Sequence, residues 1–286
     1  MVNFNSRLKD TRLHKFLLIG LFFSLVASCS GEKIDNGQVF RMPISNEPPT
    51  LDWSLATDSV SFDILTNIME GLTQYDSNME PVPAIAKRWE ISKNGKIITY
   101  YLRDDVFWTD GQPVTAHDFE YSWKRLLNPA TAAQYAYFLF DVENAQEFNS
   151  GKISDPSKVG VSAKTDHILE VRLKKPVVYF PSITTFMVTF PQRKDIVEKF
   201  GDHWTDPENI VTNGPFKLSA WEHEYKLILT ANENFYEGRP PLDTILAYVI
   251  REKTTALTLY ETGELEMVEL PPVAIPHFKN HDEYEN

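Results

Sequence analysis

The chain has 286 residues, of which 42% are hydrophobic and 13% aromatic, and its formal net charge at pH 7 is −12. This length and this apolar content are sufficient for one large domain or two domains of medium size. The excess of acidic residues disfavours nucleic acids and anionic lipid surfaces as partners, so we expect the protein to bind no nucleic acid.

Residues 1–28 have the pattern of a secretory signal peptide. Four basic residues precede an apolar run over residues 16–26, and the small residues Ala27 and Ser28 follow it. The run is too short to span a bilayer as a stable helix. Removal of residues 1–28 would take away the four basic residues and one acidic residue, which would leave a net charge of −15.

Cys29 follows directly and is the only cysteine, so an intramolecular disulfide is impossible. The sequence Val26-Ala27-Ser28-Cys29 resembles a bacterial lipobox, which implies cleavage before Cys29 and lipid attachment to its sulfur. The alternative is a free thiol buried near a cleavage site. Residues 29–37 are polar and small, which indicates a flexible spacer. We therefore expect an exported lipoprotein that is anchored to a membrane and faces the periplasm or the cell exterior.

The predicted fold begins with a strand over residues 39–44. Asn46, Glu47, Pro48 and Pro49 come next, and the two prolines keep this segment extended and prevent regular strand pairing. Apolar residues then recur at helical spacing over residues 60–72, which predicts an amphipathic helix.

Two predicted hairpins enclose a helical region, and together they indicate one compact α+β unit over residues 60–180. Asn94-Gly95 favours a tight turn in the first hairpin. The predicted strands cover residues 89–92, 97–102, 159–163 and 168–173. Between the hairpins we expect a helix over residues 119–127 and an aromatic-rich helical stretch over residues 132–148.

The block of residues 103–119 joins a strand, a turn and a helix start. Asp110-Gly111 tolerates the positive φ of a turn. Thr115 and Asp118 form a capping-box-like pair that satisfies free N–H groups of the first helical turn. Read by its physical chemistry alone, this block is a well-specified piece of scaffold that touches no ligand.

The remainder of the chain also predicts mixed helices and strands. We expect helices over residues 194–200 and 253–261, the second with Gly263 as its C-cap. The expected strands cover residues 216–220, 226–230, 245–250 and 264–270. The fold class is therefore mixed α/β.

The sequence contains no persuasive catalytic or metal-binding motif. The seven histidines lack metal-ligand spacing, and neither a G-x-S-x-G elbow nor a phosphate loop is present. We therefore expect no enzyme activity, no cofactor and no metal. Tyr135, Tyr137, Phe138, Phe140 and Trp123 form an aromatic group near one another in sequence, which predicts either core packing or the wall of a pocket.

A stretch that begins at Trp89 and includes the block of residues 103–119 resembles, together with two later stretches, the signature of the extracellular solute-binding proteins of family 5. These are the oligopeptide- and dipeptide-binding proteins of ABC importers. The first stretch includes Trp89, Asn94-Gly95, Leu102-Arg103, Trp108, Asp110-Gly111, Pro113-Val114-Thr115-Ala116 and Asp118-Phe119. The later stretches are Ile210-Val211-Thr212-Asn213-Gly214-Pro215-Phe216 with Trp221, and Asn234-Phe235-Tyr236 leading to Thr262-Gly263-Glu264.

The resemblance implies a periplasmic-binding-protein-like type II clamshell of two lobes that close on a short, extended peptide. It implies a monomer that delivers peptides to an ABC permease in the membrane. Lobe I would comprise residues 38–59 and 181–260, with residues 60–180 as its accessory subdomain, and lobe II would begin at residues 261–286. The peptide-contacting segment would be Asn46, Glu47, Pro48 and Pro49, and the aromatic wall would include Tyr135 or Tyr137.

Members of that family have roughly twice this length, so we expect most of the second lobe to be missing and peptide affinity to be weak in residues 1–286 alone. Two other functions stay open at this point. One is a truncated, transport-independent surface lipoprotein or peptide-signal module. The other is a binding protein for nickel, haem or a sugar, which relatives bind.

Overall fold

The structure is a computed structural model that describes residues 38–279. The predicted signal peptide, the spacer of residues 29–37 and the lipidation site Cys29 lie outside the described residues. The described elements include two four-stranded sheets and one two-stranded sheet. Among residues 38–279, no helix combines the length and the apolar character that crossing a membrane requires.

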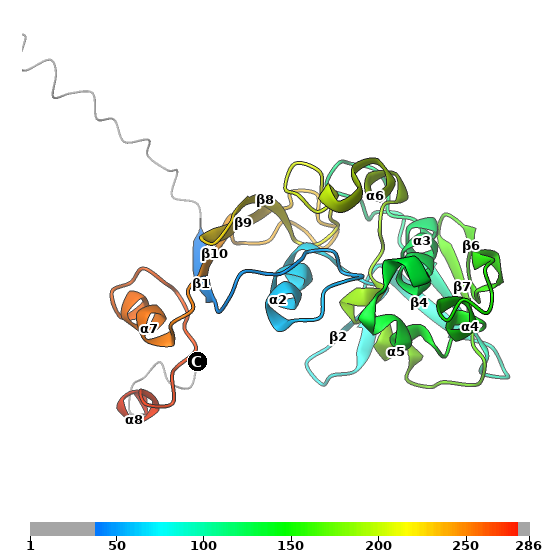
Figure 1. Ribbon diagram of the computed structural model, residues 1–286, viewed down its shortest axis with the longest axis horizontal. Coiled ribbons are helices and arrows are strands. Elements are labelled where there is room, and N and C mark those ends of the chain that lie inside the picture. Colours follow the sequence, from blue (N-terminus) through cyan, green and yellow to red (C-terminus); the bar gives the residue numbers. More distant parts are fainter. Residues whose placement is uncertain (1–37, 280–286) are drawn as a thin grey trace, which may run out of the picture. The chain divides into compact units, whose positions relative to one another are not determined.

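The first sheet has the strand order β1-β10-β9-β8. Its strands are β1 (Val39–Ile44), β8 (Phe216–Glu222), β9 (Lys226–Ala231) and β10 (Thr244–Val249). β1 pairs with β10 in parallel, whereas the other pairs are antiparallel. Buried and half-buried residues alternate along β9, so one face of the sheet is directed towards the core. All four strands were predicted from the sequence, and the structure confirms them (Figure 1).

Helix α2 (Ser59–Ile68) packs against β8 of this sheet. Its buried residues Val60, Ile64, Leu65 and Ile68 recur at helical spacing. The helix ends earlier than the apolar pattern predicts, because the chain entering β8 crosses it there. The N–H of Gly214 donates to the Ile68 carbonyl (2.9 Å), and a Cβ on Gly214 would lie 2.5 Å from the carbonyl carbon of Ile68.

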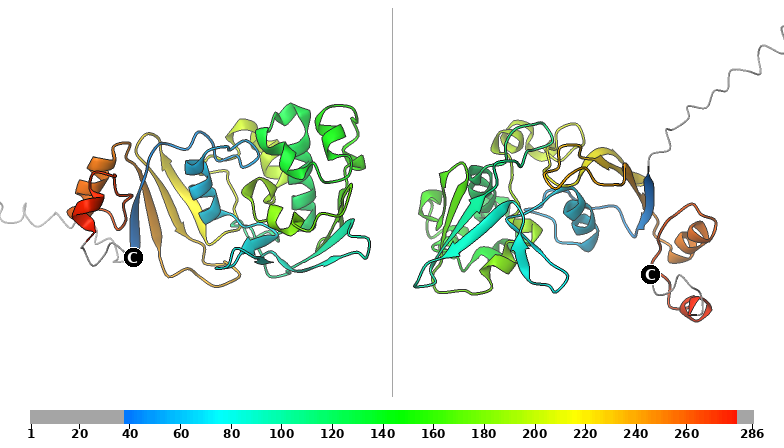
Figure 2. Two further views of the ribbon diagram at one scale, coloured as in Figure 1. Left: turned by 90° about the horizontal axis from the view of Figure 1, so that it is seen from below. Right: turned by 180° about the vertical axis from the view of Figure 1, so that it is seen from behind.

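The second sheet has the order β4-β5-β7-β6 and is built from the two predicted hairpins. Its strands are β4 (Ala86–Ile91), β5 (Ile97–Leu102), β6 (Val161–Thr165) and β7 (Ile168–Arg172). Gly95 has a φ of +69° in the first turn, as the Asn94-Gly95 pair predicts. Helix α3 (Ala116–Leu127) contacts β6 and β7 (Figure 2). A separate pair is formed by β2 (Thr73–Tyr75) and β3 (Pro81–Pro83).

The turn and helix start within residues 103–119 form as predicted. Gly111 has a φ of +85° and donates its N–H to the Trp108 carbonyl (2.8 Å). At the start of α3, the N–H of Thr115 donates to Oδ2 of Asp118 (2.8 Å), and the N–H of Asp118 donates to the Thr115 carbonyl (3.1 Å). The buried indole of Trp108 lies 3.4 Å from the same carboxylate through its Nε1, so Asp118 links the turn to the helix.

The helical stretch predicted over residues 132–148 is confirmed in part. It contains two short helical pieces, η2 (Gln134–Leu139) and α4 (Ala145–Asn149), and η1 (Pro129–Thr131) lies just before it. Ala132 and Asn144 have φ values of 52° and 59°, which a continuous right-handed helix does not accommodate. Val142 also forms a β-bridge with Leu173, so tertiary pairing with the second sheet interrupts the helical pattern.

The predicted strand over residues 264–270 is also absent. Helix α7 (Lys253–Glu261) ends as expected, with Gly263 at a φ of +77°. The chain then reaches β1, where the N–H of Glu266 donates to the Arg41 carbonyl (3.0 Å) and the Arg41 guanidinium pairs with the Glu266 carboxylate (2.7 Å). The backbone contact with β1 is thus limited to Glu266. The neighbouring residues make no paired backbone hydrogen bonds with β1, so no strand ladder forms.

The remaining elements are short, except for α6. They are η3 (Pro156–Lys158), α5 (Phe180–Ile183), η4 (Met187–Thr189), α6 (Lys194–Phe200), η5 (Gly201–His203) and α8 (Ile275–Phe278). The core includes the fully buried side chains of Trp53, Trp108, Trp123, Tyr100 and Phe119. These large aromatic side chains account for part of the high aromatic content of the sequence.

Candidate functional site

The segment that follows β1 is held against the β8–β9 hairpin by the carboxylate of Glu47. Trp221 donates from Nε1 to Oε1 of Glu47 (2.8 Å), and the N–H of Glu224 donates to Oε2 (3.1 Å). Nδ1 of His223 lies 2.6 Å from Oε1. Partial burial raises the pKa of the Glu47 carboxyl, but the hydrogen bonds outweigh it and hold the pKa below its ordinary value. Glu47 therefore anchors this segment.

A cavity of about 390 Å³ lies at this anchor. It is lined by Glu47, Pro48, Pro49, Trp221, His223 and Glu224. The rings of Trp221 and His223 lie 4.9 Å apart and form an aromatic edge beside the carboxylate. Of the four residues predicted for this segment, Pro48 is buried, Glu47 is half-buried and Asn46 and Pro49 are exposed. The cavity combines an apolar surface with a carboxylate whose acceptor positions are largely occupied by protein donors.

Tyr135 and Tyr137 belong to an aromatic cluster with Phe62, Phe138 and Phe186. The centre of the Phe186 ring lies 5.5 Å from Phe62, 5.9 Å from Tyr135 and 4.8 Å from Phe138. Tyr137 stacks on Phe138 at 4.7 Å and is 54% exposed. The Tyr135 hydroxyl donates to the Thr57 carbonyl (3.2 Å). The cluster therefore presents aromatic ring surface to solvent, which suits apolar and main-chain groups of a ligand.

The sequence did not correctly predict which residues belong to this aromatic cluster. Trp123 is fully buried, packs against Phe180 at 6.1 Å and donates from Nε1 to the Thr189 carbonyl, so it belongs to the core. Phe62 and Phe186 join the cluster although they are distant in sequence from Tyr135. Phe62 was hidden among apolar residues that signal only a helix face, and no local signal identified Phe186.

The structure does not bring the two predicted parts of the site into contact. Neither Tyr135 nor Tyr137 lines the cavity at Glu47, and the recorded ring contacts of the cluster involve α2, η2 and Phe186. The hydrogen bond from Tyr135 to Thr57 nevertheless ties η2 to the chain that continues from the Glu47 segment into α2.

Another cavity, of about 300 Å³, lies where β1 and β10 end and α2 begins. Four charged residues line it. Arg251 pairs with Glu224, and Lys253 pairs with Glu269. Asp63 has no ion pair in the described part of the chain, and partial burial together with the nearby Asp58 raises its pKa. The cavity therefore offers one uncompensated carboxylate to a cationic group.

The histidines do not converge on a metal site. Within residues 38–279, no group of three or more His, Cys, Asp or Glu side chains could hold a metal ion. His203 and His223 each lie beside one carboxylate, Asp206 and Glu47 respectively. The first pair is local to one turn, whereas the second is part of the Glu47 anchor.

Comparison with known proteins identifies the protein family to which this chain belongs. The model of the bacterial extracellular solute-binding proteins, family 5 (middle), matches residues 80–286, which is more than half of the chain. The chain therefore belongs to this family, as the motif resemblance predicts. The family is one of solute-binding proteins.

The chain is also similar to individual peptide-binding proteins. The chain is 34% identical to the dipeptide-binding protein DppE of Bacillus subtilis over 89% of its length and 49% of the relative's. It is 36% identical to the oligopeptide-binding protein OppA of the same organism, over 90% and 49% of the respective lengths. The substrate-binding domain of an oligopeptide ABC transporter from Bacillus anthracis superposes with a TM-score of 0.82 at 35% identity, covering 86% of this chain and 48% of that one.

The chain thus spans about half the length of the curated relatives that it matches. The structure of Listeria monocytogenes OppA bound to peptide gives the same result, with a TM-score of 0.82, 31% identity and coverage of 86% and 49%. These similarities confirm the predicted fold class, a mixed α/β fold of the periplasmic oligopeptide-binding type.

Proposed function

We propose that this protein captures short, extended peptides outside the cytoplasm and delivers them to an ABC permease. The observation that carries the proposal is the similarity of nearly all of the described fold to dipeptide- and oligopeptide-binding proteins at 34–36% identity. The absence of a metal cluster within residues 38–279 gives no support to nickel as the solute.

In this proposal, the aromatic cluster forms one wall of the peptide site. Tyr137 supplies an exposed ring surface. Tyr135 supplies a ring whose position is fixed by its hydrogen bond to Thr57. An extended peptide binds mainly through its own backbone groups, so broad sequence tolerance follows. The segment of Asn46, Glu47, Pro48 and Pro49 forms part of the opposite boundary, where Glu47 acts through its anchoring of the backbone more than through a free carboxylate.

Export and anchoring belong to the same proposal. The signal peptide and Cys29 support a lipoprotein that faces the periplasm or the cell exterior and acts as a monomer beside its permease. Residues 38–59 and 181–260 would form lobe I, residues 60–180 its accessory subdomain, and residues 261–286 the start of lobe II. Labelling with palmitate tests the lipid anchor. If a Cys29→Ser variant still incorporates the label, Cys29 is not the lipidation site.

The test of peptide binding is isothermal titration calorimetry with two tripeptides, tri-alanine and Ala-Phe-Ala. The protein is expressed from its whole natural reading frame, since residues 1–286 span only half of the relatives. We expect micromolar or tighter binding of both peptides. Because interface residues that matter cost more than about 1 kcal/mol on truncation, Tyr137→Ala should weaken Ala-Phe-Ala at least about fivefold.

Tyr179→Ala is the matched control, since Tyr179 is 57% exposed and lies outside the aromatic cluster. A folded protein that shows no heat with either peptide, or that binds nickel, haem or a sugar instead, contradicts the proposal. If Tyr137→Ala and Tyr179→Ala lose equal peptide affinity, the aromatic cluster is not part of the peptide site, although the protein still binds peptide.

A further inference from the structure

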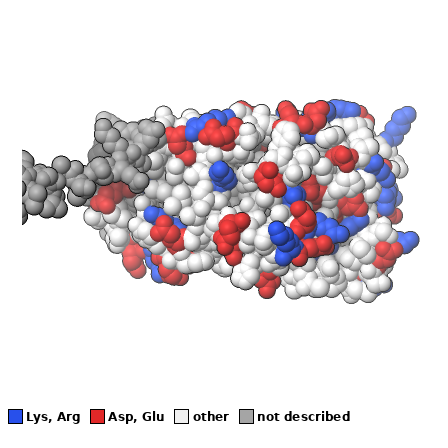
Figure 3. Space-filling model, turned by 90° about the horizontal axis from the view of Figure 1, so that it is seen from above, with Lys and Arg blue, Asp and Glu red and all other residues white. Residues whose placement is uncertain are grey.

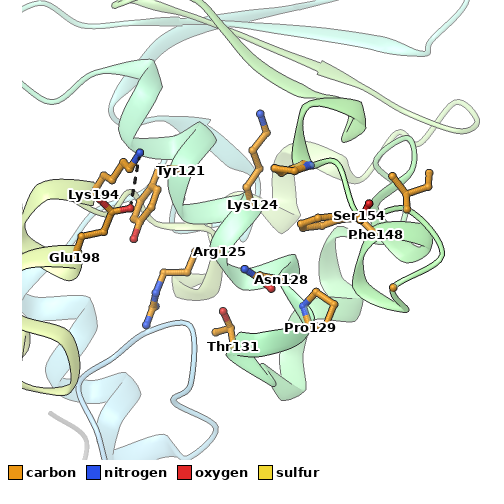
Figure 4. Close-up of a pocket in the computed structure, with 13 residues that line it drawn as sticks. Tyr121, Lys124, Arg125, Asn128, Pro129, Thr131, Phe148, Ser154, Lys194 and Glu198 are labelled. Atoms are coloured by element: carbon orange, nitrogen blue, oxygen red, sulfur yellow. Dashed lines mark ion pairs between the residues drawn. The ribbon is translucent and has the colours of Figure 1, made fainter.

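A cavity of about 730 Å³ lies apart from the Glu47 segment and the aromatic cluster. Its floor is the second half of α3, and its walls come from η1, the segment of residues 148–156 and α6 (Figure 4). It shares no lining residue with the cavity at Glu47 or with the aromatic cluster. Its volume lies within the range of about 300–1,000 Å³ that is typical of small-molecule sites.

The charge of the lining is unlike that of the whole chain. Three cationic side chains, those of Lys124, Arg125 and Lys194, line the cavity together with the single carboxylate of Glu198, whereas the chain has a net charge of −12. Figure 3 shows acidic and basic side chains interspersed over one face of the molecule.

The counter-ions of two of these cations are not among the lining residues. Lys124 pairs with Glu120, and Arg125 pairs with Asp52 at 2.6 Å, but neither Glu120 nor Asp52 lines the cavity. Lys194 pairs with Glu198 on the rim at 3.7 Å, and both side chains are more than half exposed. The lining itself therefore carries more positive than negative groups.

Neutral donors and apolar walls complete the lining. The hydroxyl groups of Tyr121, Thr131 and Ser154 make no hydrogen bond with any residue of the described chain. A tyrosine hydroxyl is protonated at neutral pH, and burial raises the pKa of Tyr121 further. Figure 4 places Tyr121 and Lys194 towards one side and Phe148 with Ser154 towards the other, with α3 between them. Phe148 supplies a flat apolar surface.

We propose that this cavity binds a small amphipathic organic anion, with one acidic group carried on an apolar ring system. The acidic group accepts hydrogen bonds from Lys124 and Lys194 and from the free hydroxyl groups, while the ring packs on Phe148. Donors outnumber acceptors in the lining, which disfavours cations and neutral amines. This site is additional to the proposed peptide site and does not depend on it.

The test compares two fluorescent probes that differ in one group. 8-Anilino-1-naphthalenesulfonate carries a sulfonate, whereas N-phenyl-1-naphthylamine has the same ring system without it. Titration of the full chain should show one saturable site for the sulfonate, with affinity that falls as salt is added, and at least about tenfold weaker binding of the neutral probe. Saturating tri-alanine should leave the sulfonate affinity unchanged, which separates this site from peptide binding.

Variants locate the site. Ser154→Trp, at an exposed rim position, should fill the cavity and abolish saturable binding of the sulfonate. Lys194→Gln should weaken it about two- to fivefold, the effect expected for one exposed charge contact. Lys217→Gln, on the exposed face of β8, is the matched control and should have no effect. Thermal unfolding confirms that each variant is folded.

Equal affinity for the two probes would overturn the proposal, because the site would then be merely apolar. Unchanged sulfonate binding by Ser154→Trp would overturn it as well, since the probe would then lie elsewhere. The same holds if Lys217→Gln and Lys194→Gln have equal effects.

Discussion

Glu70 carries a half-buried carboxyl where distant segments of the chain meet. The Tyr236 hydroxyl donates to its Oε2 (2.8 Å), and the N–H of Glu70 donates to Oδ1 of Asn213 (2.9 Å). The Arg103 guanidinium carbon lies 4.8 Å from the centre of the Tyr236 ring. Burial and the nearby Glu237 raise the pKa of Glu70 to about 7, although Tyr236 and Arg103 act in the opposite direction.

This carboxyl makes stability depend on pH. Its pKa is higher in the folded chain than the ordinary value of 4.5, so the folded state binds the proton more tightly than the unfolded state. The stabilisation is fully present below pH 4.5 and is lost as the pH rises through about 7. Glu70→Gln should remove this dependence and gain about 1–3 kcal/mol relative to the parent chain between about pH 5 and pH 8.

Urea unfolding at a series of pH values measures this difference. Glu80→Gln, at an exposed position of the same segment, is the matched control and should leave the pH profile unchanged. If the profile of Glu70→Gln parallels that of the parent chain across this range, the assignment to Glu70 is wrong.

Among the elements, α3 depends on a single carboxylate at its start. Asp118 accepts from the N–H of Thr115 and lies 3.4 Å from Nε1 of the buried Trp108. Burial raises the pKa of Asp118, although the hydrogen bonds from Thr115 and Trp108 oppose the shift. The carboxylate therefore caps the helix and satisfies a buried donor at the same time.

Asp118→Ala should destabilise the protein by about 1–2 kcal/mol, because one capping acceptor is lost and the Trp108 N–H loses its partner. Asp118→Asn retains an acceptor oxygen and should cost less than half as much. Denaturant titration followed by tryptophan fluorescence gives both values. A loss below about 0.5 kcal/mol for the alanine variant would show that α3 does not rely on this cap.

Elements with strong local signals were predicted well. The hairpin turn at Asn94-Gly95 and the cap of α3 are confirmed, and Gly263 takes a positive φ directly after Thr262, which is the C-cap of α7, because turn and cap chemistry involves neighbouring residues only. The helical stretch expected over residues 132–148 is divided into short pieces, since the left-handed residues Ala132 and Asn144 and the bridge of Val142 to Leu173 arise from packing.

At the scale of the whole molecule, a buried ion pair joins the segment after β1 to α3. The Arg125 guanidinium donates from Nη1 to Oδ1 and from Nη2 to Oδ2 of Asp52, at 2.9 and 2.6 Å. Trp204 donates to the same carboxylate from Nε1 (3.3 Å), and the N–H of Ser54 donates to Oδ1 (3.0 Å). The Asp52 side chain is only 7% exposed, so its charge depends on these partners.

Arg125→Met should destabilise the protein by about 3–5 kcal/mol, because it leaves a buried carboxylate without its counter-ion. Asp52→Asn combined with Arg125→Met should recover part of this loss, since no uncompensated charge stays buried. Arg88→Met, which breaks the exposed pair with Glu90, should cost far less than Arg125→Met and is the control. Calorimetric unfolding compares the four proteins, and equal losses for Arg125→Met and Arg88→Met would contradict this account.

The sequence by itself determined the family and most of the element order. The block of residues 103–119 and the stretches after it carry the family motif, and alternation, helical spacing and turn residues predicted the strands of both sheets, because these signals are local. The domain boundaries and the residues of the peptide site stay predictions.

Only the tertiary structure decided which distant residues meet. Glu47 is anchored by Trp221 from a segment 174 residues away, and Asp52 and Arg125 are 73 residues apart. Phe62 and Phe186 join Tyr135 in one cluster for the same reason. Such contacts depend on how the elements pack, and nothing in the local residue pattern specifies a partner on another element.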